Sequence, residues 1–253
     1  MSAVAPKSEV ALKPKAAIPD PSVEKPAQAT VSLRTVAGLE VASVVASVFI
    51  SVWVIIPLQP QHRWLMAIPG LLALTLVVNS HRLRGERFRD LGFSPRHFGQ
   101  ALRMVALPTL LACAVFAAIG QATGSFHRTT HFWSSLLVLP VWALTQQYVL
   151  QAFIYRRMRV VFGDGSGAPD TQRRLAIAAT AGIFSLVHAP NPTLMILTFL
   201  GALLWCRVYE RAPNLWALGL SHAIISLMLM TSLPSWLLPS MSVGYKHFLY
   251  QKF

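Results

Sequence analysis

Long apolar segments, separated by shorter polar ones, occupy most of the chain. Several of them reach the length of about 18 residues that an α-helix needs to cross a hydrocarbon layer. We predict these segments: Val36–Leu58, Trp64–Asn79, Gln100–Gly120, Phe132–Ile154, Leu175–Ala189, Leu194–Tyr209, Leu215–Thr231 and Leu233–Val243. The last is short and fits either a short span or a helix at the membrane surface. The pattern therefore predicts an all-α, polytopic bundle of about eight transmembrane helices.

Residues 1–33 differ from the rest of the chain. They are rich in Pro, Ala, Lys and Glu and lack periodic apolar positions, a composition typical of disordered segments. They do not fit a signal peptide, because the first apolar segment begins too late and no small-residue cleavage site stands out. We therefore predict a disordered cytoplasmic tail over residues 1–33 and a membrane-embedded domain over residues 34–253.

The composition agrees with a membrane protein. Apolar residues make up 54 % of the 253 residues, and charged residues make up only 12 %. A soluble domain has about 25 % charged residues, so a soluble fold is excluded.

The basic residues follow the predicted topology. They concentrate in the N-terminal tail and after the second, fourth and sixth predicted spans, and very few lie on the intervening side. Because positive side chains favour the cytoplasmic side, this alternation predicts that the N- and C-termini are both cytoplasmic. Topology then explains the net charge of +13, and nucleic acid is not an expected partner. The expected partner is the lipid bilayer, whose anionic headgroups suit the Arg82–Arg103 stretch.

Polar side chains interrupt three of the predicted spans. Gln146, Gln147 and Gln151 lie in the fourth, His188 in the fifth and His222 in the seventh. Measured from the nearest basic residues, the three positions lie about 15 to 21 Å from the cytoplasmic edge, near the middle of a layer about 30 Å thick. An unpartnered polar group is costly in hydrocarbon. Convergence at one depth therefore favours a shared polar cavity over the alternative, separate interhelical hydrogen bonds.

Local spacing supports a cavity. Three pairs have the four-residue interval that places side chains on one face of a helix: Gln147 with Gln151, Phe184 with His188, and His222 with Ser226. Asn191 lies in a Pro-Asn-Pro sequence that ends the fifth predicted helix, because proline disfavours helical backbone before it.

These stretches resemble the CAAX-protease and bacteriocin-processing family of intramembrane endopeptidases. That family has Glu-Glu-x3-Arg on one helix, Phe-x3-His on the next, and His-x3-Asn or His-x3-Asp on a later one. The matching stretches here are Gln146-Gln147-x3-Gln151, Phe184-x3-His188 and His222-x3-Ser226. Their order and intervals agree with the family, and the resemblance extends over about residues 100–230. It also implies an eight-helix plan.

The resemblance implies hydrolysis of a peptide bond in a membrane-associated or lipidated peptide, in the cytoplasmic membrane of a bacterium. Carried over by position, Gln146 takes the place of the base and His188 that of its partner in activating a water. His222 and Ser226 take the positions that stabilise the oxyanion, and Gln147 and Gln151 take the supporting positions. Phe184 belongs to the motif of His188.

The glutamines change this chemistry. A glutamine amide does not titrate, so Gln146 can orient a water but cannot be a general base. His188 is one substitute, since histidine titrates near neutral pH. Glu40, the one acid inside an apolar span, is another. The leading prediction is a peptidase with a histidine base. The alternative is a non-catalytic relative that binds a peptide or membrane partner in the same cavity. A transporter is weaker, because no broken helix pair or acidic relay is apparent.

A metal site is not expected. Zinc normally takes at least three protein ligands from His, Cys, Asp and Glu, and the predicted cavity offers only His188 and His222. Gln146 and Asn191 would be poor additional ligands. We therefore predict no metal and no cofactor, with zinc as the disfavoured alternative.

Overall fold

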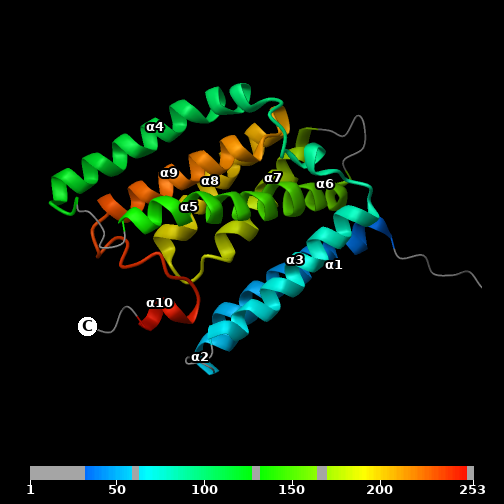
Figure 1. Ribbon diagram of the computed structural model, residues 1–253, viewed down its shortest axis with the longest axis horizontal. Coiled ribbons are helices and arrows are strands. Elements are labelled where there is room, and N and C mark those ends of the chain that lie inside the picture. The colour runs from blue at the N-terminus through cyan, green and yellow to red at the C-terminus, as the bar shows by residue number, and fades with distance from the viewer. Residues whose placement is uncertain (1–31, 59–62, 127–131, 164–169, 250–253) are drawn as a thin grey trace, which may run out of the picture. The chain divides into compact units, whose positions relative to one another are not determined.

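The computed structural model describes residues 32–58, 63–126, 132–163 and 170–249. Helices form the regular structure of these residues, and no strand occurs among them (Figure 1). The predicted all-α class is confirmed. Most of the predicted tail, residues 1–31, lies outside the described residues; the first helix begins at Leu33, after Ser32, whose Oγ accepts a hydrogen bond from the Thr35 backbone N–H at 3.1 Å.

The elements follow one another along the chain with short connections. In order they are α1 (Leu33–Phe49), η1 (Ile50–Ile55), α2 (Ile56–Leu58), η2 (Arg63–Met66), α3 (Ala67–Leu83), η3 (Phe88–Leu91), α4 (Phe98–Thr123), α5 (Phe132–Gln147), η4 (Tyr148–Tyr155), α6 (Arg156–Phe162), α7 (Asp170–Leu186), α8 (Pro192–Arg211), α9 (Leu215–Ser232) and α10 (Tyr245–Leu249). Three runs are continuous: α1 with η1 and α2, η2 with α3, and α5 with η4 and α6. Six of the first seven predicted spans fall on these helices or runs, and the fifth, Leu175–Ala189, extends past the end of α7 at Leu186 into a turn.

Five helical runs among the described residues are long and apolar enough to cross a membrane: Leu33–Leu58, Phe98–Thr123, Trp133–Phe162, Pro192–Arg211 and Leu215–Ser232. The helix α3 is apolar but shorter. The chain is therefore an integral membrane protein of helical class, as the sequence predicts. The predicted count of about eight spans is not confirmed.

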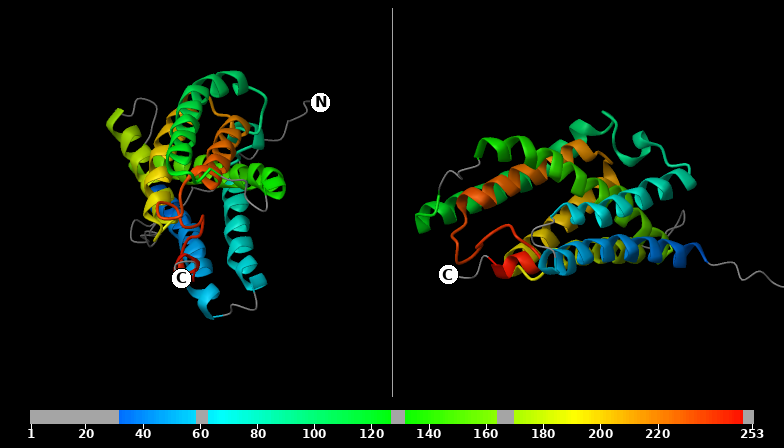
Figure 2. Two further views of the ribbon diagram at one scale, coloured as in Figure 1. Left: turned by 90° about the vertical axis from the view of Figure 1, so that its left-hand side faces the viewer. Right: turned by 60° about the horizontal axis from the view of Figure 1, so that its bottom comes forward.

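The described helices pack in three groups. The helix α9 contacts both α4 and α5, α7 packs against α8, and α1 packs against α3 and α6 (Figures 1 and 2). A close approach joins α9 to α5 at Gly219, where an added Cβ would lie 3.2 Å from the Cα of Leu144. Gln147 lies one helical turn after Leu144 on α5, and His222 lies one helical turn after Gly219 on α9. The small residue thus brings two polar side chains of the candidate cavity together.

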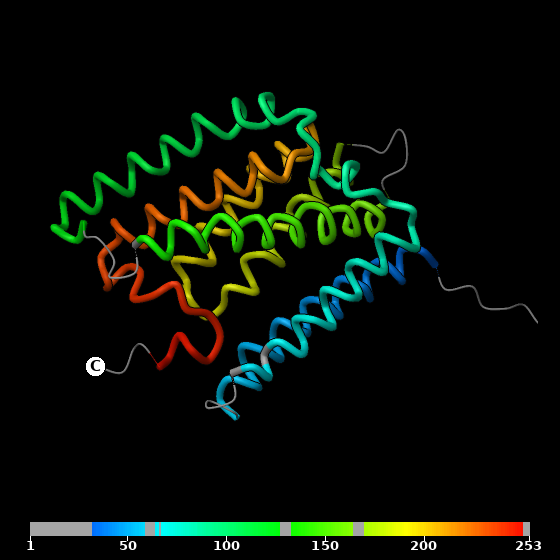
Figure 3. The backbone as a smooth tube through the Cα atoms, viewed as in Figure 1, coloured from blue at the N-terminus to red at the C-terminus, as the bar shows by residue number. Residues whose placement is uncertain are grey.

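The prediction of an eighth helical span over Leu233–Val243 is wrong. Residues 233–243 form turns and irregular backbone and no helix. Pro234 and Pro239 account for this, since proline removes a backbone donor and disfavours helical backbone before it. The segment instead returns to the turn between α7 and α8 (Figure 3), where the N–H of Gly244 donates to the carbonyl of Ala189 at 2.8 Å.

The described C-terminal residues lie at the opposite end of the first helix from Leu33. The helix α10 contacts η1 and α2, and the rings of Trp53 and Phe248 are 6.1 Å apart. Both chain ends lie outside the described residues, so the cytoplasmic location of the N- and C-termini stays a prediction.

Candidate active site

The centre of the candidate site is a contact between α5 and α9. The Nε2 of Gln147 lies 3.4 Å from the Nδ1 of His222. Gln147 is fully buried, and His222 is only 7 % exposed. The polar groups predicted on the fourth and seventh spans therefore meet in the interior.

A second amide determines which way Gln147 faces. The Nε2 of Gln151 donates to the Oε1 of Gln147 at 3.3 Å, so the Nε2 of Gln147 is directed to His222. An amide nitrogen only donates, and the Nδ1 of His222 must therefore accept. The proton of a neutral His222 then resides on Nε2. This tautomer is assigned from the hydrogen-bond partners of His222. It leaves the Nε2–H of His222 as a donor on the side of the ring that faces away from Gln147.

The backbone around these glutamines is unusual. From Tyr148 to Tyr155 the helix is a π-helix, η4, placed between α5 and α6. Such segments are rare and occur often at functional sites. Gln147 is the last residue of α5 and Gln151 lies within η4, so the change in helix type begins at the candidate site.

His188 lies in the turn after α7 and has the opposite tautomer. Its Nδ1 is 2.6 Å from the carbonyl oxygen of Phe184. A carbonyl can only accept, so Nδ1 carries the proton and Nε2 of a neutral His188 has a free lone pair. The ring of Phe184 lies 4.8 Å from that of His188 and 6.1 Å from that of His222. Phe184 thus contacts both imidazoles and joins them into one site. His188 is partly exposed, whereas His222 is buried.

Three residues that the sequence analysis did not select hold His222 in place. Trp205 of α8 lies against the imidazole, with 4.6 Å between ring centroids and 32° between planes. Its indole N–H donates to Ser221 at 3.2 Å, and Ser221 shares a 2.8 Å hydrogen bond with Thr109 of α4. These partners are far apart in the chain and have no common motif. Only the position of Ser221 beside His222 could have pointed to them.

The remaining motif residues differ in their surroundings. Ser226 is buried one turn beyond His222 on α9, as the spacing predicts. Gln146 is partly exposed, and the glutamine that contacts His222 is Gln147. The residue at the family's base position is therefore the more open of the two neighbouring amides.

Asn191 has a structural role in this arrangement. It caps α8 by accepting a hydrogen bond from the Leu194 backbone N–H at 3.2 Å. Its Nδ2 donates to the carbonyl of Ser240 at 2.9 Å and lies 3.4 Å from that of Ser242. Asn191 therefore fixes the C-terminal segment beside the turn that contains His188.

Glu40 belongs to a separate ionic cluster. Its carboxylate binds Arg84 at 2.9 Å, Arg157 at 3.1 Å and the Ser80 hydroxyl at 2.7 Å. These contacts join α1, the end of α3 and α6, where the predicted cytoplasmic loops meet. The candidate base Glu40 is thus already engaged in two ion pairs.

Glu86 completes this cluster. It binds Arg156 at 2.7 Å, Arg157 at 2.9 Å and His81 at 2.6 Å. Burial alone would raise the pKa of the Glu86 carboxyl, but the hydrogen bonds from His81, Arg157 and Arg156 outweigh it and hold that pKa well below its ordinary value. Arg157, which bridges both carboxylates, is only 1 % exposed.

The donor atoms of the candidate site do not suit zinc. The site offers two imidazoles, which is one ligand fewer than the three that zinc normally takes from His, Cys, Asp or Glu. Its two amides are poor zinc ligands. Within the described ranges no three residues of those types gather into a group that could hold a metal ion. No reaction step is therefore assigned to a metal.

The fold and the site together define an integral membrane helical protein with a polar site buried between its helices. Residues 128–228 match the family model described as type II CAAX prenyl endopeptidase Rce1-like, so this segment of the chain is similar to that family. The segment includes every motif from Gln146 to Ser226, which confirms the resemblance predicted from those motifs. No curated protein and no solved structure gives a significant match to the chain. The family is one of proteases, which favours a peptidase.

Proposed function

We propose that the protein is an intramembrane endopeptidase that hydrolyses a peptide bond in a membrane-associated or lipidated peptide, in the cytoplasmic membrane of a bacterium. The observation that supports this most directly is the pair of imidazoles, to which their hydrogen-bond partners assign opposite tautomers. His188 has a free lone pair on Nε2, and His222 has its proton on Nε2. Hydrolysis of an amide requires one base and one oxyanion donor.

In this mechanism the Nε2 of His188 accepts a proton from water while the water oxygen attacks the carbonyl carbon. The carbonyl oxygen becomes an oxyanion and accepts a hydrogen bond from the Nε2–H of His222. The tetrahedral intermediate then collapses, the C–N bond breaks, and the amine leaves with the proton held by His188. The products are a carboxylic acid and an amine.

The glutamines have supporting roles in this proposal. Gln147 keeps the Nδ1 of His222 in its accepting state, and Gln151 keeps Gln147 in the required orientation. Gln146, partly exposed, orients the water. None of the three titrates, so the base is His188.

A second function has its own support. Gln147 and Gln151 are fully buried, and glutamine replaces the glutamate that the family pattern has at the base position. Both features suit a non-catalytic relative that binds a peptide or membrane partner in the same site. In that case His188 would contribute to partner binding and not to turnover.

The test compares wild type, His188→Ala and Gln146→Glu, purified and reconstituted in liposomes with a library of membrane-anchored peptides. Mass spectrometry reads cleavage. We expect wild type to cleave and His188→Ala to lose at least about a hundredfold in rate, the usual contribution of a general base. The matched control is Thr145→Ala, an exposed position on α5 next to the glutamines, which should retain activity.

Other results would change the conclusion. Cleavage by Gln146→Glu alone would mean that wild type is a dormant scaffold with an intact site. Absence of cleavage by every folded variant would favour the binding function. Equal cleavage by wild type and His188→Ala would remove His188 from the mechanism.

A further inference from the structure

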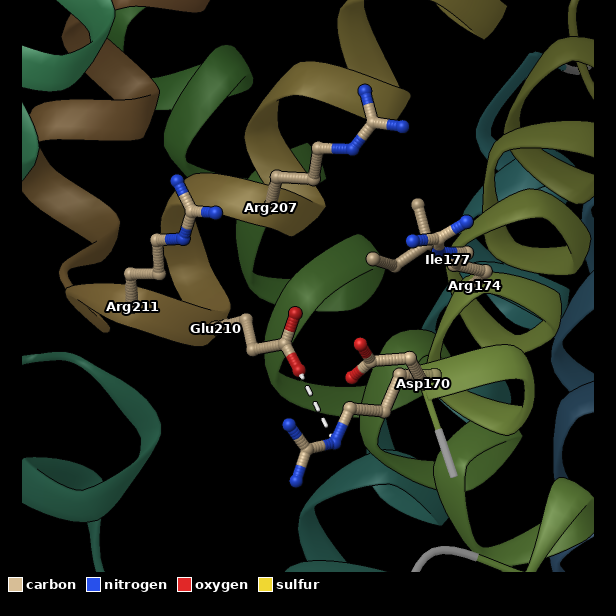
Figure 4. A pocket seen from close by; sticks show the side chains of 7 residues that line it. Asp170, Arg174, Ile177, Arg207, Glu210 and Arg211 are labelled. Atoms are coloured by element: carbon tan, nitrogen blue, oxygen red, sulfur yellow. Dashed lines mark ion pairs between the residues drawn. The ribbon is translucent and has the colours of Figure 1, made fainter. Parts of the chain in front are cut away.

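A charged pocket lies between the start of α7 and the end of α8, on the arginine-rich side of the protein. Its volume is about 510 Å³, within the range of about 300 to 1,000 Å³ typical of ligand sites. Figure 4 shows the side chains that surround it. They are Asp170, Arg173, Arg174, Ile177, Arg207, Glu210 and Arg211.

The charges in this pocket do not cancel. The Nε of Arg173 pairs with Glu210 at 3.8 Å, the interaction drawn as a dashed line in Figure 4. Within the described part of the chain, Arg174, Arg207 and Arg211 have no carboxylate at ion-pair distance. Four arginines and two acids leave an excess of two positive charges. The pocket is therefore suited to an anion.

The position of the pocket narrows the choice of anion. The helix α8 is a candidate membrane span that ends at Arg211, and Arg207 and Arg211 are exposed one turn apart on it. Arginines at the end of a span lie at the level of lipid headgroups. Arg174 contributes from the N-terminal part of α7. Apolar Ile177 lines the same pocket, as a site beside acyl chains requires.

We propose that this pocket binds the phosphate group of an anionic phospholipid headgroup. Guanidinium groups hold phosphate oxygens through paired hydrogen bonds, and Arg174, Arg207 and Arg211 supply three of them from two helices. A zwitterionic headgroup would carry its own positive charge into a pocket that already has an excess. A phosphodiester with an uncharged headgroup has no such cost. The site is separate from the histidines, so it stands whether or not they catalyse hydrolysis.

The test measures lipid binding to the full chain purified in a neutral detergent. Short-chain phosphatidylglycerol and phosphatidylcholine are titrated against wild type and against Arg207→Gln/Arg211→Gln, and native mass spectrometry counts the bound lipid. Wild type should prefer phosphatidylglycerol, and the double variant should lose about 30-fold in affinity, since each arginine near a headgroup contributes about fivefold. Lys7→Gln/Lys13→Gln removes the same charge from the N-terminal tail, which contributes no residue to the pocket, and should retain binding.

A third variant tests the sign of the effect. Glu210→Gln removes a negative charge from the pocket and should tighten phosphatidylglycerol binding by about fivefold, an effect that misfolding would not produce. Inorganic phosphate serves as the second probe, and competition by millimolar phosphate would assign the site to a soluble phosphate compound instead of a lipid. Equal loss in the two double variants, or equal binding of the two lipids by wild type, would overturn the proposal.

Discussion

At the scale of single residues, Arg157 shows how much of the structure depends on contacts that the chain pattern does not reveal. It bridges Glu40 and Glu86 while being almost fully buried. Glu40 lies 117 positions away from it, so no local spacing relates the two. By contrast, the four-residue interval of Gln147 and Gln151 predicted their shared helix face, and the hydrogen bond between them agrees. Short-range geometry was accessible from the sequence, and the partner of a buried charge was not.

Replacement of Arg157 by methionine should destabilise the protein by about 3 to 5 kcal/mol, because two carboxylates would remain buried with fewer cationic partners. Thermal unfolding in detergent, followed by intrinsic fluorescence, measures the change. Arg96→Met, an exposed position, should change stability by less than about 0.5 kcal/mol. Similar losses for the two variants would mean that the bridge contributes little to stability.

At the scale of elements, apolar length predicted where helices occur but not their form. The run from Phe132 was predicted as one span, and the structure has one continuous helix there. Its π-helical part, η4, had no signal in the pattern, because residues suited to a π-helix do not differ in apolar spacing from those of an ordinary α-helix over so short a segment. Residues 233–243 were misassigned for a related reason. Their apolar composition suits burial as well as a membrane span, and Pro234 and Pro239 decide against a helix.

Gly244 offers a test of the C-terminal segment. It has a φ of +60°, and an added Cβ would lie 2.6 Å from the Cβ of Val52 in η1. Gly124 has a φ of +64° and no neighbour within 4 Å of such an atom, so it matches the backbone strain without the clash. Gly244→Ala should therefore be less stable than Gly124→Ala by about 1 to 3 kcal/mol, the usual cost of overpacking.

Hydrogen–deuterium exchange gives the location of this effect. Faster exchange should appear over residues 237–249 in Gly244→Ala and not in Gly124→Ala. If the two variants have the same stability and the same exchange, the segment does not pack closely against η1.

At the scale of the whole molecule, the arginine-rich connections meet at one end of the bundle, as the charge pattern predicts. The cluster around Glu86 joins the connection after α3 to the start of α6, and the pair of Arg173 with Glu210 joins α7 to α8. Which side of the membrane this end faces, and with it the side of each terminus, stays a prediction from the charge alternation.

The cluster makes the stability of the whole protein sensitive to acid. The pKa of Glu86 is lower in the folded protein than in the unfolded chain, so the ionised carboxylate stabilises the fold at pH values above the unfolded pKa of about 4.3. This stabilisation is lost as the pH falls below about 4 toward the lower folded value. Melting temperatures measured from pH 7 to pH 3 should decline across that range.

Glu86→Gln separates this effect from general acid denaturation. The variant should be less stable than wild type at pH 7 and should lose less stability between pH 5 and pH 3. Parallel melting curves for the two proteins across the range would show that Glu86 does not cause the dependence.

The hydrogen bonds of the C-terminal segment have a consequence for genetics. Gly244 donates to Ala189, the neighbour of His188, and the carbonyl of Ser240 accepts from Asn191. All four of these positions influence the turn on which His188 stands, although Ser240 and Gly244 lie beyond the segment that matches the family. A nonsense codon shortly before Gly244 would leave every motif residue encoded and still disturb that turn. In a mutational screen, null alleles should therefore extend past codon 228 and gather between codons 237 and 249.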